Sequence, residues 1–185
     1  LITQQAERLL PTVLSRVVRL RFDAPDNSAV QQILKAKGIT QNTRVLAALA
    51  GGSPGRALSY NQADIFVIRR EALDLLKKLP LQNPFGYIAA LGWGEKYDRA
   101  AALLLTEQFI YLLRDVLLVQ SGAGGQVYNT DIMAGLDGIA ADWSLHTARQ
   151  GVNAAQEAWQ NINKNVSAKN VLEALILKLD LLRKE

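Results

Sequence analysis

Cysteine is absent from the 185 residues of the chain, and histidine is almost absent. Without cysteine, neither a disulfide nor a thiolate metal site can form within the chain. A cysteine-free chain fits a reducing compartment, and we expect a cytoplasmic location. The single histidine, His146, lies on a polar stretch of predicted helix, where we expect a structural role. We therefore expect neither a bound metal nor a cofactor.

Sequence signatures of catalysis are also missing. No group of Asp, Glu and His residues has the spacing of metal ligands, and neither G-x-S-x-G nor H-E-x-x-H occurs. The glycine-rich run at residues 122–125 lacks the Lys-Ser/Thr pair of a phosphate loop, and it follows a helical pattern rather than a strand. We expect a flexible connection there, and no ATPase activity from this chain.

Uninterrupted hydrophobic runs are lacking as well. Residues 1–10 carry Gln5, Glu7 and Arg8 where a signal peptide would have its apolar core. The most apolar stretch, residues 103–119, is interrupted by three charged residues, which are Glu107, Arg114 and Asp115. Each such charge costs about 2.5–3.5 kcal/mol at the centre of a bilayer. We therefore predict a buried helix at 103–119 and no contact with a membrane.

What is present is the composition of an ordinary globular protein, with 49% hydrophobic and 21% charged residues. This balance excludes general disorder, and the length allows one large domain or two small ones. The net charge of +4 would favour contact with nucleic acid, although solvated helix faces explain it at least as well. The chain begins with leucine in the middle of a pattern, and we interpret it as a fragment of a longer protein.

Periodicity predicts an all-α fold with one residual strand near the N-terminus. Residues 17–22 alternate, so that Val18, Leu20 and Phe22 face one way and the residues between them face the other. This period of two, ended by Pro25, predicts a strand. Because a lone strand cannot satisfy its own backbone hydrogen bonds, we expect its partners in a preceding region.

The rest of the chain is typical of helices, short ones first and longer ones afterwards. Three short helices are expected between residues 28 and 61; the first has Ser28 as its N-terminal cap and ends at Gly38, and the third begins after Ser53. Longer helices are expected over residues 65–79, 84–91, 97–119, 131–143, 144–162 and from 167 onward. In the last of these, Asp180 and Lys184 are predicted to form an exposed i,i+4 pair.

The first of two motifs lies at residues 9–16, which read Leu-Leu-Pro-Thr-Val-Leu-Ser-Arg directly before the predicted strand. It resembles the Ser-Arg-Cys motif of clamp-loader subunits in the AAA+ ATPase superfamily, with Val17 where that family usually has cysteine. The resemblance implies that Arg16 is an arginine finger that acts on the ATP of a neighbouring subunit. Such a finger places a planar, permanent charge on the transferring phosphate. The alternative is that Arg16 is a surface residue at the end of a helix.

The second motif lies at residues 49–58, which read Leu-Ala-Gly-Gly-Ser-Pro-Gly-Arg-Ala-Leu. It resembles the sensor-2 motif of the AAA+ lid, in which an arginine at a helix N-terminus faces nucleotide phosphates. The resemblance implies a cofactor-binding role for Arg56, at a position where free N–H groups favour anions. The alternative is a Gly-Gly helix end followed by a Ser-Pro helix start, which any pair of helices could use.

The spacing within the second motif indicates which kind of clamp-loader subunit the chain resembles. Two residues, Pro54 and Gly55, separate Ser53 from Arg56, and this form is more similar to bacterial delta-prime subunits of DNA polymerase III than to the ATP-hydrolysing loader subunits. The asparagines before the final helix, and the leucine-rich pattern at residues 171–179, also resemble that family.

The resemblance implies three parts: the tail end of a truncated AAA+ ATPase domain at 1–24, a helical lid at 25–61, and a helical collar for oligomerisation at 62–185. It implies a non-catalytic subunit that assembles with gamma/tau and delta subunits. Through the whole complex, a DNA polymerase III holoenzyme with clamp-loader ATPase, it would act on the sliding clamp and primed DNA. Two alternatives stay open: a C-terminal fragment of the ATP-hydrolysing gamma/tau subunit, and a generic helical protein-interaction domain.

Overall fold

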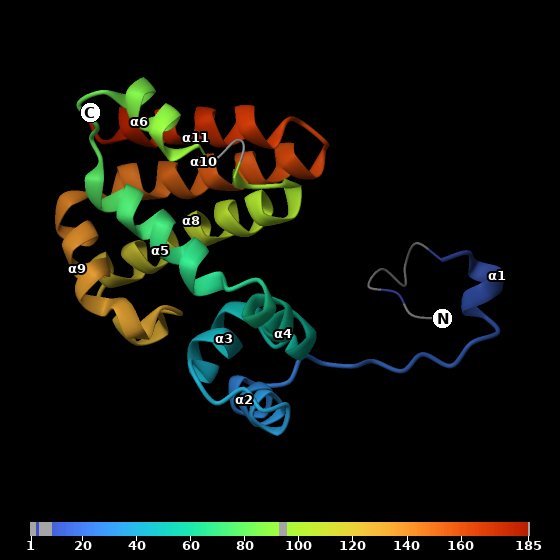
Figure 1. Cartoon of the computed structure of the whole chain (residues 1–185). Coiled ribbons are helices and arrows are strands. Elements are labelled where there is room, and N and C mark those ends of the chain that lie inside the picture. Colours follow the sequence, from blue (N-terminus) through green and yellow to red (C-terminus); the bar gives the residue numbers. More distant parts are fainter. Residues whose placement is uncertain (1–2, 4–8, 93–95, 185) are drawn as a thin grey trace.

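The computed structural model describes residues 3, 9–92 and 96–184, and the elements that it places there are all helices (Figure 1). The chain therefore has the all-α fold that the sequence predicted. Two short 3-10 helices, η2 (Gly124–Gln126) and η3 (Thr130–Ile132), lie between α8 and α9. The α-helices are α1 (Pro11–Leu14), α2 (Asn27–Ala36), α3 (Thr43–Ala50), α4 (Pro54–Gln62), α5 (Ile65–Lys78), α6 (Pro84–Leu91), α8 (Arg99–Gln120), α9 (Met133–Asp142), α10 (Leu145–Asn163) and α11 (Ala168–Leu182).

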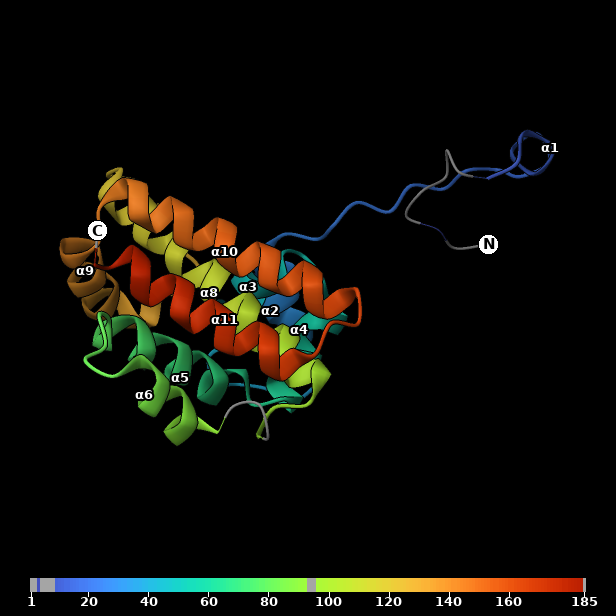
Figure 2. The same ribbon diagram turned by 90° about the horizontal axis from the view of Figure 1, so that it is seen from above.

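The residual strand predicted at residues 17–22 is wrong. This segment is extended but forms no ladder with any other described residue, and it runs away from the helices in two perpendicular views (Figures 1 and 2). Its alternating apolar side chains are solvent-exposed, with Val18 at 88%, Leu20 at 76% and Phe22 at 91%. The alternation predicts an extended backbone, but a strand also requires a second strand to receive its hydrogen bonds.

Helices α2, α3 and α4 pack against one another and form the three-helix group, which spans residues 27–62. The first of them begins two residues earlier than predicted, because the carboxylate of Asp26, rather than Ser28, accepts the backbone N–H of Ala29 at 2.8 Å. The Ser28 hydroxyl instead donates to Asp26. The predicted end at Gly38 is confirmed, with this glycine in the left-handed region at φ +83°. Such a residue commonly ends a helix without a steric penalty.

The Gly51-Gly52 pair makes the turn between α3 and α4. Both residues are left-handed, with φ +57° and +80°. A Cβ on Gly52 would lie 2.8 Å from the Cβ of Ala24 and 2.8 Å from the carbonyl oxygen of Pro25. Only glycine allows the incoming chain to pass this closely, so the turn also fixes where residues 24 and 25 meet the three-helix group.

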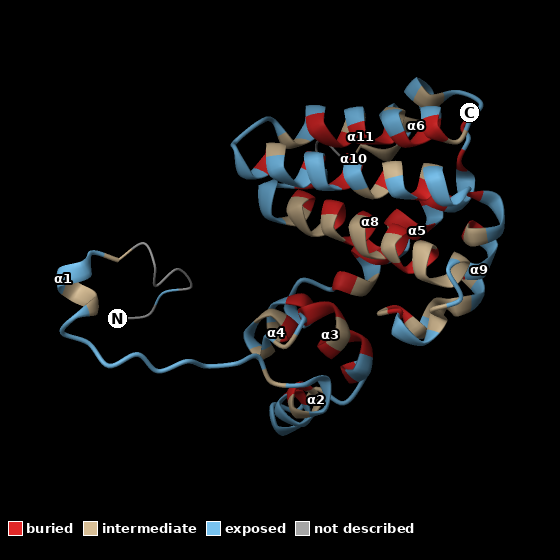
Figure 3. Ribbon diagram, turned by 180° about the vertical axis from the view of Figure 1, so that it is seen from behind, coloured by how far each residue is buried: buried red, intermediate tan, exposed pale blue. Residues whose placement is uncertain are grey.

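The second group of helices, from α5 to α11, is the helical bundle, built around α8 (Figures 1 and 2). Helices α8 and α10 run antiparallel. Arg99, at the start of α8, donates to the carbonyls of residues 162 and 163 at the end of α10. Gln120, at the end of α8, donates to the carbonyl of Trp143 just before the start of α10. Gly151 allows the close approach, since a Cβ there would lie 3.0 Å from Leu113. The buried residues line the inward faces of the helices (Figure 3).

The helix spans predicted for the bundle agree with the structure to within a few residues, and α6 agrees at both ends. The predicted exposure of Asp180 is wrong. Its side chain is 2% exposed, and it accepts the backbone N–H of Leu81 at 2.5 Å and the ammonium of Lys184 at 2.6 Å. The predicted ion pair is therefore present, although its carboxylate is buried. This carboxylate also holds the connection between α5 and α6 against α11. None of the described helices combines the length and the apolar character needed to cross a bilayer.

Candidate functional site

Arg16 lies two residues after α1, at the start of the exposed N-terminal segment. Its backbone N–H donates to the carbonyl of Val13 at 3.0 Å, and this bond closes the last turn of the helix. Its side chain is exposed, and it has no hydrogen bond or ion pair with any described residue. The guanidinium is therefore accessible to another molecule, as a finger would have to be.

Arg56 lies in the first turn of α4, where its backbone N–H donates to the Ser53 hydroxyl at 3.3 Å. This confirms Ser53 as the predicted cap. The guanidinium turns towards α8 of the bundle. There its Nε donates to the Tyr60 hydroxyl at 2.6 Å, and its Nη2 donates to the carboxylate of Glu107 and to the Tyr111 hydroxyl, the latter at 2.9 Å.

A second hydrogen bond ties Glu107 to α4. The Tyr60 hydroxyl donates to Glu107 Oε2 at 2.5 Å, so each carboxylate oxygen has a partner on α4. Burial and the neighbouring Glu107 raise the pKa of Tyr60, and burial also raises the pKa of Tyr111. Burial opposes the charge on Arg56, but Glu107, Tyr111 and Tyr60 together outweigh this effect and raise the pKa of Arg56. The cluster therefore consists of an ion pair and two neutral phenols, and we call it the Arg56 cluster.

The structure brings Arg56 to Glu107, and it does not bring Arg56 to Arg16. Helix α1 lies well away from α4 in both perpendicular views (Figures 1 and 2). Sequence reasoning identified Arg56 but missed its three partners. A signal for one of them was present, because Glu107 is one of the three charges that interrupt the apolar stretch 103–119. A charge on a buried helix needs a partner, and the partner of Glu107 proves to be the arginine of the second motif.

The other two charges of that stretch belong to a second polar network. Asp115 is fully buried, and it accepts the backbone N–H groups of Tyr128 and Asn129 at 2.9–3.1 Å, the Asn129 amide at 2.8 Å and the Arg114 guanidinium at 3.0 Å. Arg69 of α5 in turn donates to Asn129 at 2.9 Å and pairs with Asp131. These contacts fix the loop that follows the glycine-rich run.

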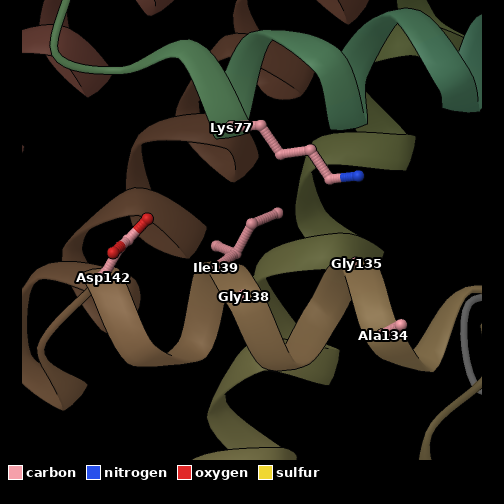
Figure 4. A pocket seen from close by; sticks show the side chains of 6 residues that line it. All are labelled: Lys77, Ala134, Gly135, Gly138, Ile139 and Asp142. Atoms are coloured by element: carbon pink, nitrogen blue, oxygen red, sulfur yellow. The ribbon is translucent and has the colours of Figure 1, made fainter.

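A pocket of about 410 Å³ lies between α5 and α9 (Figure 4). Lys77 extends over it from α5, Asp142 stands at its other end, and Gly135 and Gly138 line the side formed by α9. The lining brings together no nucleophile and base. His146 is exposed in the first turn of α10, and the described residues contain no cluster of acids and histidines that could hold a metal ion.

The fold and these contacts define an all-α protein in which an arginine cluster connects a three-helix group to a larger bundle. The chain is 22% identical over 182 residues to the DNA polymerase III subunit delta' of Bacillus subtilis (strain 168). The match covers 97% of this chain but 55% of the length of that relative. No family model matches the chain. The similarity extends over nearly the whole chain and supports the relationship to delta-prime subunits that the two motifs indicated.

Proposed function

We propose that this chain is a non-catalytic part of a DNA polymerase III clamp loader that functions in DNA replication in the cytoplasm. The observation that carries the proposal is the similarity to a delta-prime subunit over 97% of the chain. The two arginine motifs, at residues 9–16 and 49–58, resemble the same family. The partners would be gamma/tau and delta subunits, with the sliding clamp and primed DNA bound by the assembled complex.

The proposed roles are divided among the N-terminal segment and the two groups of helices. Residues 1–24 would be the end of an ATPase domain, residues 25–61 the lid, and residues 62–185 the collar that joins the subunits. The packing supports this division, since α2 and α3 contact one another and α4, while α8 organises the helices of the bundle. Exposed apolar side chains on the bundle, among them Trp159 and Leu181, offer contact area to neighbouring subunits.

Arg16 is the proposed arginine finger towards an adjacent gamma/tau subunit. Its exposed guanidinium, free of partners among the described residues, supports this role. We expect Arg16→Ala, made in the full-length protein, to lower ATP hydrolysis by the adjacent gamma/tau subunit on the order of 100-fold or more while the complex still assembles. Arg19→Ala is the matched control, because it removes a neighbouring exposed arginine and should leave the rate unchanged. An unchanged rate with Arg16→Ala in the assembled complex would refute the finger assignment.

Assembly is tested first, by co-elution of the chain with the gamma/tau and delta subunits of the same organism on a sizing column. A stable complex without DNA supports the collar role. Failure of both this chain and the full-length protein to bind any loader subunit would favour a generic helical interaction domain instead. ATP turnover by the purified full-length protein alone would favour the gamma/tau alternative.

A further inference from the structure

Few connections hold the three-helix group to the bundle. The covalent one is the two-residue joint between α4 and α5, residues 63 and 64, where Asp64 is left-handed at φ +49°. Helix α4 lies against α5, whereas α2 and α3 have their main contacts with one another and with α4. The polar connection is the Arg56 cluster, which joins residues that are 47 to 55 positions apart in the chain. The orientation of the three-helix group therefore depends on a short joint, on the apolar packing of α4 against α5, and on this cluster.

The geometry of the cluster suits a fixed orientation. Glu107 is held by two different residues of α4, at both carboxylate oxygens, so rotation of α4 about α8 breaks at least one of the two bonds. The Arg56 guanidinium also lies 5.2 Å from the centre of the Tyr60 ring, which limits its own freedom. The side chain of Glu107 is 14% exposed and that of Arg56 is 40% exposed, so the carboxylate lies on the inner side of the pair. Separation would leave a poorly solvated carboxylate without its cation, which is costly.

We propose that Arg56, Tyr60 and Glu107 form a latch that fixes the three-helix group on the bundle, with Glu107 occupying the position that an anionic ligand of Arg56 would take. The carboxylate and the phosphate oxygens of a nucleotide are acceptors of the same kind for a guanidinium. An anion that took the place of Glu107 on Nη2 would release the carboxylate, and the latch would open. Arg56 is thus a positioning residue, and the orientation of the group is coupled to what occupies its guanidinium. This inference does not depend on the proposed partners.

The absence of native cysteine makes a direct test possible. Cysteines introduced at two exposed positions, Lys37→Cys at the end of α2 and Gln156→Cys on α10, would be the only thiols in the chain. Spin labels on them report the distance between the two groups of helices by pulsed electron paramagnetic resonance. We expect one narrow distance distribution for the native latch. With Glu107→Ala we expect the distribution to broaden by about twofold or more, because only the joint and the apolar contact of α4 with α5 then hold the three-helix group in place.

Two further variants distinguish the loss of a latch from a general loss of stability. Glu157→Ala removes an exposed acid on α10 that pairs with Lys178 within the bundle, and it should leave the distribution narrow. Glu107→Gln keeps the shape of the side chain and removes the charge, so it should broaden the distribution even if Glu107→Ala fails to fold. Circular dichroism confirms that each variant keeps its helices. An unchanged distribution in a folded Glu107→Gln or Glu107→Ala protein would overturn the latch.

The anion position has its own test, in which sodium acetate is the probe. In the Glu107→Ala protein, acetate should bind at the vacated guanidinium, and isothermal titration calorimetry measures its affinity. The distance distribution should stay broad, because free acetate has no link to α8. In the double variant Arg56→Ala/Glu107→Ala, acetate should bind much more weakly, since the cation is gone. Sodium chloride at the same ionic strength is the control for screening. If the two variants bind acetate equally, the assignment of this position is wrong.

Discussion

At the scale of single residues, three charges on α8 show how a mostly apolar helix can carry ionised groups. Glu107 pairs with residues of α4, whereas Arg114 and Asp115 contact the loop before α9. Arg114 also lies over the Tyr128 ring, at 3.9 Å from its centre. A buried charge without a partner destabilises the folded state by several kcal/mol, so each of these residues requires a specific contact in the fold.

Asp115 gives the first residue-scale prediction. We expect Asp115→Asn to lower the free energy of unfolding by about 1–3 kcal/mol, because an amide group replaces an oxygen that accepts backbone N–H donors and leaves them unsatisfied. Urea unfolding followed by circular dichroism measures the change. Asp137→Asn on the exposed face of α9 is the matched control and should change stability little. Equal effects of the two substitutions would show that the loop does not depend on Asp115.

The pH dependence of stability follows from three tyrosines. Burial, together with a hydrogen bond to Glu107 or Glu71, raises the pKa of Tyr60 and Tyr97, and burial raises that of Tyr111. A group whose pKa is higher in the folded state stabilises the protein fully below its unfolded pKa, which is about 10 for tyrosine. The contribution is lost as the pH rises above that value, because only the unfolded chain then ionises. We therefore expect the urea midpoint to fall steadily above about pH 10.

Tyr60→Phe tests the source of this alkaline slope. The variant has no phenol at position 60, so its midpoint should decline less steeply above about pH 10, whatever its stability at neutral pH. Tyrosinate absorbance during the same titration shows when the buried phenols ionise. If ionisation of the folded protein is complete before the midpoint moves, the buried tyrosines are not the cause.

At the scale of elements, sequence reasoning was most successful where a local signal ends a helix. The left-handed glycines at 38 and 51, and the Ser53-Pro54 start of α4, set boundaries through contacts within a few residues. The error at Ser28 is of the same local kind, because Asp26 and Ser28 are both good caps and only the geometry decides between them. Helix ends could therefore be predicted to within about a turn, whereas the faces that meet could not.

Gly151 of α10 gives a prediction at this scale, since it lies against side chains of α8 and α11. A Cβ there would lie 3.0 Å from Leu113, 3.2 Å from Trp143 and 3.4 Å from Leu179. We expect Gly151→Val to destabilise the bundle by about 1–3 kcal/mol, because the added methyl groups force the helices apart. Gly138→Val on α9, where nothing lies within 4 Å of a Cβ, is the control and should have a small effect. Comparable losses at both sites would show that helix propensity, rather than packing, sets the cost.

At the scale of the whole molecule, the parts that could not be predicted are those that depend on distant contacts. The pairing of Arg56 with Glu107 joins residues 51 positions apart, and no local pattern contains it. The burial of Asp180 depends on Leu81, which is 99 positions away. The error at residues 17–22 has the opposite cause, because the local pattern there is clear but no described residue pairs with the segment. Periodicity reports which face of a segment is apolar, and it does not report what covers that face.

The N-terminal segment gives the last prediction. Residues 17–22 have no backbone hydrogen bond to other described residues, and the buried core begins only at Val30. We expect trypsin to cut first after Arg16, Arg19 or Arg21, and to leave a product that keeps its helices. The buried Arg69 is the internal control, since cleavage there requires the bundle to open. Mass spectrometry of early products checks the order of cleavage, and early cutting after Arg69 would contradict it. Protection of Arg16 in the assembled loader would place this arginine in an interface, as the finger proposal requires.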